Sequence, residues 1–77
     1  MQHRIDISSL EEFQYSAMLV SSLEQCKRII STTVIRGREM INEYHISKYL
    51  SGFDESTIQY YEVTNDLGKA IRIYNAL

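Results

Sequence analysis

Large apolar and aromatic side chains are numerous in this sequence for so short a chain, and this restricts its fold more than any other feature. The chain has 77 residues, of which 44% are apolar and 23% are charged, as in soluble globular proteins. A chain of this length forms one domain and buries only about 60% of the surface that its unfolded form exposes. We therefore expect a single domain over residues 1–77, with apolar side chains left for a second molecule to cover.

The segment that follows Ser8 and Ser9 has the pattern of an amphipathic helix. Either serine is a suitable N-terminal cap, and Glu11 and Glu12 would lie in the first turn, where the helix dipole favours negative charge. At 100° per residue, one broad apolar arc contains Phe13, Ala17, Leu19, Val20, Leu23, Cys26 and Ile30. The arc spans more than half of the circumference, so one neighbouring helix could not cover it. We therefore expect a homo-oligomer, in which self-association uses Phe13, Leu19, Val20 and Leu23.

Two segments after this helix allow more than one interpretation. Residues 29–35, IISTTVI, are β-branched except for Ser31, which suits a strand, but a continuation of the helix is also tenable. Residues 38–50 look helical, although their apolar side chains fall on two sides. That helix would be covered on two faces, or it would break near His45.

The C-terminal region also has two interpretations. Residues 57–64, TIQYYEVT, are rich in strand-forming residues, and residues 65–68 could turn into a second strand over residues 70–74. Against this β-hairpin, one helical stripe fits Leu67, Ala70, Ile71, Tyr74 and Leu77. We favour helices, and the sequence then predicts a mainly α fold, a small domain of three or four helices, with the C-terminal β-hairpin as the rival.

Residues able to support catalysis are few. Acid and base catalysis needs titratable groups that converge in a pocket, and the candidates are His3, His45 and Cys26. Cys26 lies on the apolar arc, where a thiol behaves as a small hydrophobic group. The spacing of these residues does not match a zinc site, the acidic residues do not match a calcium loop, and the three glycines are scattered singly. We expect no catalytic activity, no cofactor and no metal.

The charges and the apolar runs bear on partners and location. The formal net charge of -2 disfavours a general binder of nucleic acid or of anionic membranes. The charge is uneven, because residues 27–38 carry four basic side chains and no acidic one, whereas residues 51–68 carry four acidic side chains and no basic one. Residues 1–9 lack the signal-peptide pattern, and no apolar run approaches the roughly 20 residues of a membrane helix. We therefore expect a cytoplasmic protein with no membrane partner.

Tyrosines are concentrated in the C-terminal half. Five of the six tyrosines follow residue 43, together with Phe53. Tyrosine is enriched in interface hot spots because it combines a large ring with a polar tip. So small a domain could not readily bury all of these rings, so we expect several to form an exposed patch. The candidate partner-binding residues are Tyr49, Phe53, Tyr60, Tyr61 and Tyr74.

Residues 52–62, GFDESTIQYYE, resemble the turn and recognition helix of helix-turn-helix regulators of the mercury-resistance-regulator and Cro/repressor types. A glycine, a small capping residue, a Thr-Ile pair and a Tyr-Glu ending recur there, and residues 46–50, ISKYL, resemble the supporting helix. The resemblance implies a helix-turn-helix corner near residues 46–61. The DNA contacts that it implies are Glu55, Ser56, Gln59 and Tyr60 near the bases and Thr57 or Tyr61 near phosphate. A DNA-binding regulator of this kind would add Arg36 and Arg38 on the DNA backbone. The acidic character of residues 51–68 disfavours DNA, because recognition segments depend on cationic contacts with phosphate.

These observations predict a small, non-enzymatic regulatory or adaptor protein. It would bind another protein, whose identity the sequence does not reveal, through a tyrosine-rich and acidic C-terminal surface, and it would also self-associate. The alternative is a dimeric helix-turn-helix transcriptional regulator that binds DNA.

Overall fold

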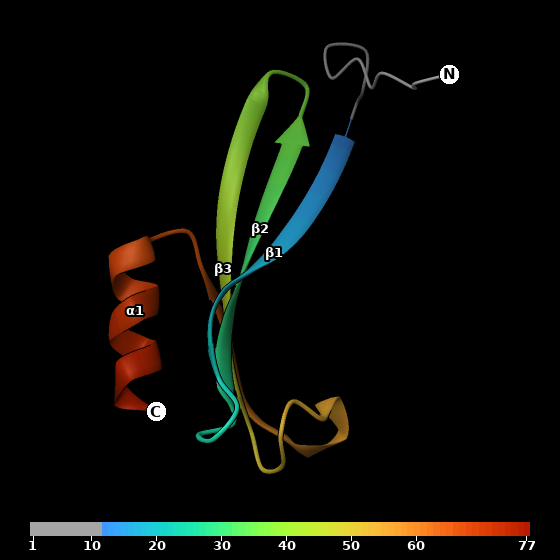
Figure 1. The fold of residues 1–77 in the computed structure, drawn as a ribbon. Coiled ribbons are helices and arrows are strands. Elements are labelled where there is room, and N and C mark those ends of the chain that lie inside the picture. Colours follow the sequence, from blue (N-terminus) through green and yellow to red (C-terminus); the bar gives the residue numbers. More distant parts are fainter. Residues whose placement is uncertain (1–11) are drawn as a thin grey trace.

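The structure, a computed structural model, describes residues 12–77, and in this part the chain is mainly antiparallel β-sheet (Figure 1). Four strands form one sheet in the order β1-β2-β3-β4, so each strand pairs with the next one in the sequence. A 3₁₀ turn, Glu55–Thr57, directly precedes β4. The strands and the C-terminal helix are β1 (Glu12–Ser22), β2 (Lys27–Arg36), β3 (Glu39–Tyr49), β4 (Ile58–Thr64) and α1 (Leu67–Ala76).

The predicted mainly α fold of three or four helices is wrong. The segment expected as the first helix forms β1, the turn at residues 23–26 and the start of β2, while the expected caps Ser8 and Ser9 lie outside the described residues. An apolar arc wider than half a helix leaves little polar face, so it carried no true helical periodicity. Antiparallel pairing between β1 and β2 satisfies the backbone hydrogen-bonding groups of this segment instead. The pairing is regular except at a bulge between Met18 and Val20.

For the other segments, the structure distinguishes between the helix and strand alternatives that the sequence allows. Residues 29–35 lie in β2, as their β-branched side chains allow. The helix expected over residues 38–50 is wrong, because β3 occupies Glu39–Tyr49 and its two apolar sides are the two faces of a strand. In the C-terminal region Ile58–Thr64 is a strand, whereas Leu67–Ala76 is the helix that the apolar stripe predicts, so the β-hairpin over this region is also wrong.

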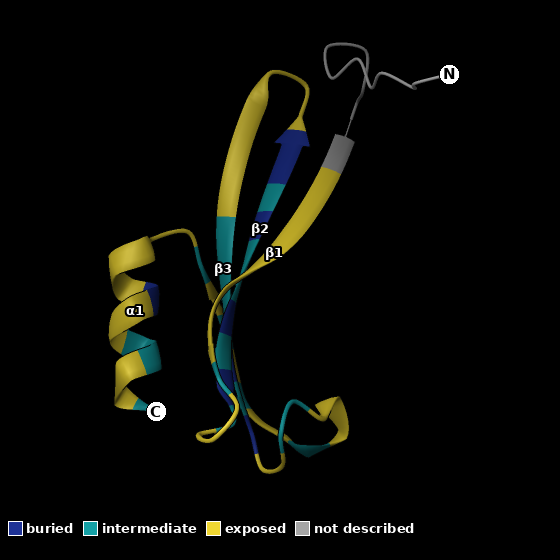
Figure 2. Cartoon of the chain, viewed as in Figure 1, coloured by how far each residue is buried: buried dark blue, intermediate teal, exposed yellow. Residues whose placement is uncertain are grey.

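The core is small and lies between the sheet and α1 (Figure 2). Ile29 of β2 and Ile46 of β3 are opposite each other in the register, and both are 0% exposed. Ala70 of α1 is equally buried, so the helix backbone comes close to the sheet at this point. The partly buried side chains that pack around these three residues are Tyr44, Ile73, Tyr74 and Leu77.

Lys27 fastens the C-terminal end of α1 to the sheet. Its Nζ donates hydrogen bonds to the backbone oxygens of Tyr74 and Leu77, at 2.9 and 3.3 Å, and lies 4.4 Å from the centre of the Tyr74 ring. A cation at this end is favourable because the last carbonyls of a helix carry partial negative charge. At the other end, the Asp66 side chain caps the helix by accepting from the backbone N–H of Lys69 at 3.1 Å.

The helix covers one face of the sheet and mainly the strands β2, β3 and β4. We call the face opposite α1 the open face (Figure 1). Residues 50–57 pack against one end of this face, and no further layer of the described chain lies over the rest of it. Within residues 12–77, no helix is long and apolar enough to cross a lipid bilayer.

Replacing Ile46 by alanine should lower the free energy of unfolding by about 2–5 kcal/mol, because the change leaves a cavity in a fully buried position. The matched control is Leu50→Ala, at a side chain that is 69% exposed, where we expect a change within about 0.5 kcal/mol. Urea denaturation of the two variants measures the difference. Equal losses would show that Ile46 does not belong to the core.

Cys26 ends the β1–β2 turn with a positive φ of 55°, a conformation that suits glycine and that β-branched side chains resist. Cys26→Val should therefore lower the free energy of unfolding by about 1–2 kcal/mol. Cys26→Gly should leave it unchanged or raise it by up to about 1 kcal/mol. Thermal denaturation gives the order of the three proteins, and a valine variant as stable as the glycine variant would contradict this turn geometry.

Candidate functional site

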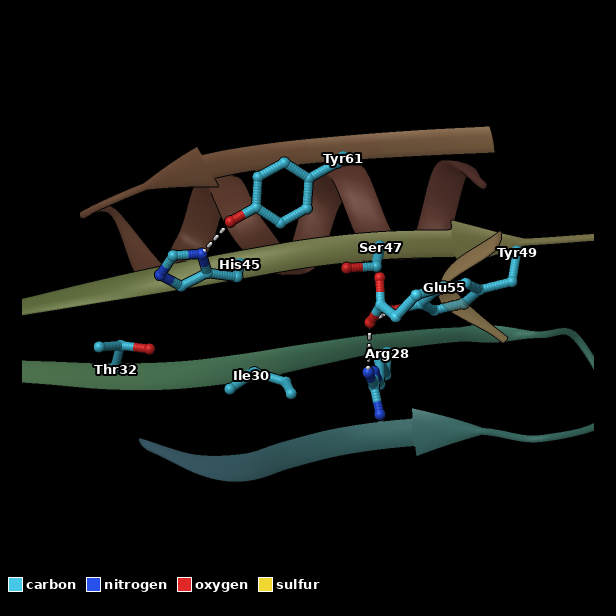
Figure 3. A pocket seen from close by; sticks show the side chains of 8 residues that line it. All are labelled: Arg28, Ile30, Thr32, His45, Ser47, Tyr49, Glu55 and Tyr61. Carbon is cyan, nitrogen blue, oxygen red and sulfur yellow. Dashed lines mark hydrogen bonds and ion pairs between the residues drawn. The ribbon is translucent and has the colours of Figure 1, made fainter. Parts of the chain in front are cut away.

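A hollow of about 180 Å³ lies on the open face, close to the loop of residues 50–57 (Figure 3). The strand register builds it, because Ile30 pairs with His45, Arg28 pairs with Ser47, and Ser47 pairs with Tyr61. Directly opposite residues of antiparallel strands share a face, so three strands contribute side chains to one depression. The lining residues are Arg28, Ile30, Thr32, His45, Ser47, Tyr49, Glu55 and Tyr61.

Arg28 lies at one end of the hollow and contacts the loop of residues 50–57. Its Nη2 lies 3.1 Å from Oε1 of Glu55, and the Tyr49 hydroxyl donates to the same oxygen at 3.1 Å. The guanidinium carbon lies 5.3 and 4.9 Å from the ring centres of Tyr49 and Phe53, which is within the range of cation–π attraction. These two rings meet edge to face at 5.9 Å. Arg28 therefore fastens the loop of residues 50–57 to the sheet.

The other end of the hollow is formed by His45 and Tyr61. Nδ1 of His45 shares a hydrogen bond with the Tyr61 hydroxyl (Figure 3). Nε2 of His45 lies 3.8 Å from Oε1 of Glu43, which is too far for a hydrogen bond. The ring of Tyr61 stands in solvent, with 56% of the residue exposed, while its hydroxyl is directed at the histidine.

Two residues around the hollow each have a buried side-chain nitrogen without a hydrogen-bond partner in the described chain, Nε of Arg28 and Nε2 of His45. The arginine Nε–H is always a donor, and Nε2 of His45 is a donor whenever Tyr61 donates to Nδ1. A buried donor without a partner costs about 1–3 kcal/mol. Both atoms are shielded from solvent, so an acceptor from a second molecule could reach them only after the side chains around the hollow shift.

The five candidate partner-binding residues do not form one surface. Tyr49, Phe53 and Tyr61 come together on the open face, around the hollow. The side chain of Tyr60 lies on the opposite face of β4 from Tyr61, because successive side chains of a strand alternate between faces. Tyr74 lies in α1 and packs against the core.

The self-association candidates all lie in β1 or in the turn after it. Leu19 and Val20 line an apolar groove between β1 and α1, while Leu23 is exposed in the turn. The side chain of Phe13 lies outside the described part of the structure.

The helix-turn-helix corner near residues 46–61 is wrong, because Ile46 and Tyr61 lie in strands and only the three residues Glu55–Thr57 between them are helical. Strand formers such as the tyrosines and isoleucines of this segment prefer the sheet. Glu55 is engaged by Arg28, and the Ser56 hydroxyl donates to Asp54 at 2.8 Å.

The other implied DNA contacts are dispersed over the sheet. Gln59 lies where the register of β3 and β4 shifts. Arg36 and Arg38 lie at the turn between β2 and β3, and the eight residue steps of strand from Arg28 to Arg36 span about 26 Å. These residues therefore do not form one DNA-reading surface.

Sequence reasoning missed Arg28, Thr32 and Ser47 as parts of a site, because the period of a helix places them on different sides. Once residues 27–36 are taken as a strand, the period of two puts Arg28, Ile30 and Thr32 on one face. Of the catalytic candidates, His45 lies in the hollow, Cys26 lies in the β1–β2 turn, and His3 is outside the described residues. Among residues 12–77, no three His, Cys, Asp or Glu side chains are grouped so that they could hold a metal ion.

Comparisons of the chain with protein-family models, with curated proteins and with solved structures found no match. The geometry of the open face and of the groove beside β1 is therefore the basis for the functional proposals that follow.

Burial, together with the nearby carboxylates of Glu43 and Glu55, raises the pKa of the Tyr61 phenol above its usual value of 10.0. At a pH above about 10 the unfolded chain then loses this proton more readily than the folded one, so stability falls as pH rises. Tyr61→Phe should lose less stability than the wild type between about pH 9 and pH 11, measured by urea denaturation. An equal loss in both proteins would contradict this assignment.

Proposed function

We propose that this protein is a small, non-enzymatic binding protein that recognises another protein through its open face. The observation that carries the proposal is an uncovered sheet face with exposed apolar side chains around a hollow, two of whose lining residues have a buried nitrogen without a partner. By register, Met18 lies opposite Ile30, Ile41 opposite Val34, and Val63 opposite His45, so all three belong to this face. Apolar patches of this kind, rimmed by polar groups, are typical of interaction sites.

The residues at the centre suit an interface hot spot. Tyrosine and arginine are the residues that most often contribute large binding energies, above all where a partner excludes water from them. Tyr61 presents its ring outward, whereas Arg28 lies beneath Glu55 with 18% of its side chain exposed. A partner that buries the Tyr61 ring would also close the hollow and place an acceptor near the unpaired nitrogens of Arg28 and His45.

The rim of the hollow indicates the chemistry of the partner. Glu55 exposes 70% of its side chain and Glu43 41%, so carboxylates stand above the more buried basic groups. Exposed carboxylates attract basic side chains and accelerate encounter with a positively charged surface. The favoured partner is therefore a protein surface with an apolar centre, a free backbone carbonyl and flanking Lys or Arg residues.

Tyr60 and Tyr61 lie on opposite faces of β4, so they provide a matched test of which face binds the partner. A photoreactive phenylalanine analogue at position 61 should crosslink the partner in the cells that make this protein, while the same analogue at position 60 should not. With the identified and purified partner, Tyr61→Ala should weaken binding by about thirtyfold, as expected for a hot spot, and Tyr60→Ala by less than about threefold.

Circular dichroism of both alanine variants controls for folding. Capture from position 60 as strong as from position 61, or no capture from either, would count against the open face as the binding surface.

A further inference from the structure

Within the described part of the chain, no second strand pairs with the outer edge of β1. In the strand order β1-β2-β3-β4, β1 pairs with β2 on one side only, so alternate backbone N–H and C=O groups face outward. Natural edge strands are blocked by charged side chains, proline or bulges, and of these the ten residues from Phe13 to Ser22 contain only the bulge between Met18 and Val20. An uncharged edge without proline can pair with another strand.

Apolar side chains accompany this edge. Leu19 and Val20 line a groove of about 310 Å³ beside β1, whose far wall is formed by Leu67 and Ile71 of α1. The groove exists because α1 packs mainly on β2, β3 and β4 and leaves β1 uncovered. Tyr15, which is 58% exposed, lies on the same side of β1, since Ser16 bonds to Thr32 on the open face and its neighbour must point the other way.

We propose that β1 pairs in antiparallel fashion with β1 of a second copy of this chain, about a two-fold axis near Ala17. Ala17 lies in the middle of β1, and pairing centred there joins residues 15–19 of the two copies, up to the bulge between Met18 and Val20. The two four-stranded sheets then join into one continuous sheet, and the outer β1 edges of both copies become hydrogen-bonded.

Charge and shape favour a second copy over a different strand. Self-pairing about Ala17 brings together residues 15–19 of both copies, which carry no charge, so it adds no repulsion although each chain has a net charge of -2. The same axis sets Leu19 opposite Tyr15 of the second copy, on the side of α1. That tyrosine would form the missing outer wall of the apolar groove. The open face stays free, so the dimer is independent of the binding surface proposed above.

Light scattering after size exclusion, under reducing conditions that exclude a disulfide through Cys26, measures the mass of the complete chain. At about 100 µM, where a dimer with a Kd of about 1 µM is almost fully formed, we expect twice the 9.0 kDa of one chain. A lysine in the interface should abolish the dimer, so Tyr15→Lys and Leu19→Lys should run as folded monomers. The control is Ile58→Lys on β4, at a residue that is 41% exposed, and it should remain dimeric.

A crosslink tests the axis itself and does not depend on the lysine variants being stable. In a Cys26→Ser background, Ala17→Cys should form a disulfide-linked dimer on mild oxidation more than about tenfold faster than Ile58→Cys, because pairing holds the two thiols at high effective concentration. A wild-type monomer at about 100 µM overturns the proposal. So does a dimer that survives both β1 lysines, a dimer lost equally in Ile58→Lys, or equal crosslinking at the two positions.

Discussion

The packing of Ile29 and Ile46 beneath Ala70 is the interaction on which the rest of the structure depends. These three side chains are fully buried, and they lie where β2, β3 and α1 meet. Lys27 continues this contact by binding the last carbonyls of the helix. Because α1 is only ten residues long, it can cover the centre of the sheet but neither β1 nor the open face.

The proposed functions follow from that limited coverage. A single short helix over four strands leaves the apolar side chains of the open face and of β1 at the surface. Such side chains are unfavourable in water, and a partner that covers them recovers about 25 cal/mol for each Å² of apolar area buried. The open face has polar and aromatic groups suited to a specific partner, while β1 has an uncharged edge suited to a second copy.

The composition predicted the excess of exposed apolar side chains but not the fold that exposes them. The broad apolar arc of residues 13–30 belongs to β1 and the start of β2, whose apolar side chains lie on both faces of the sheet. A helical period of 3.6 residues fits such a segment only by accident. The stripe from Leu67 to Leu77 predicted α1 because it is narrow and truly periodic. Composition alone suggested Tyr49, Phe53 and Tyr61 as candidates, whereas the place of Arg28 and Ser47 beside them depends on strand pairing between distant residues, which no local pattern contains.

Solvent accessibility of methyl groups tests the central claim, that only one face of the sheet is covered. With a soluble paramagnetic agent, NMR should show strong relaxation of the methyl groups of Met18 and Val63 and weak relaxation of those of Ile29 and Ile46. Dimerisation at the edge of β1 leaves this contrast in place, because the open face stays exposed. Protection of Met18 and Val63 equal to that of Ile46 would mean that a second layer covers the open face, and it would contradict the account.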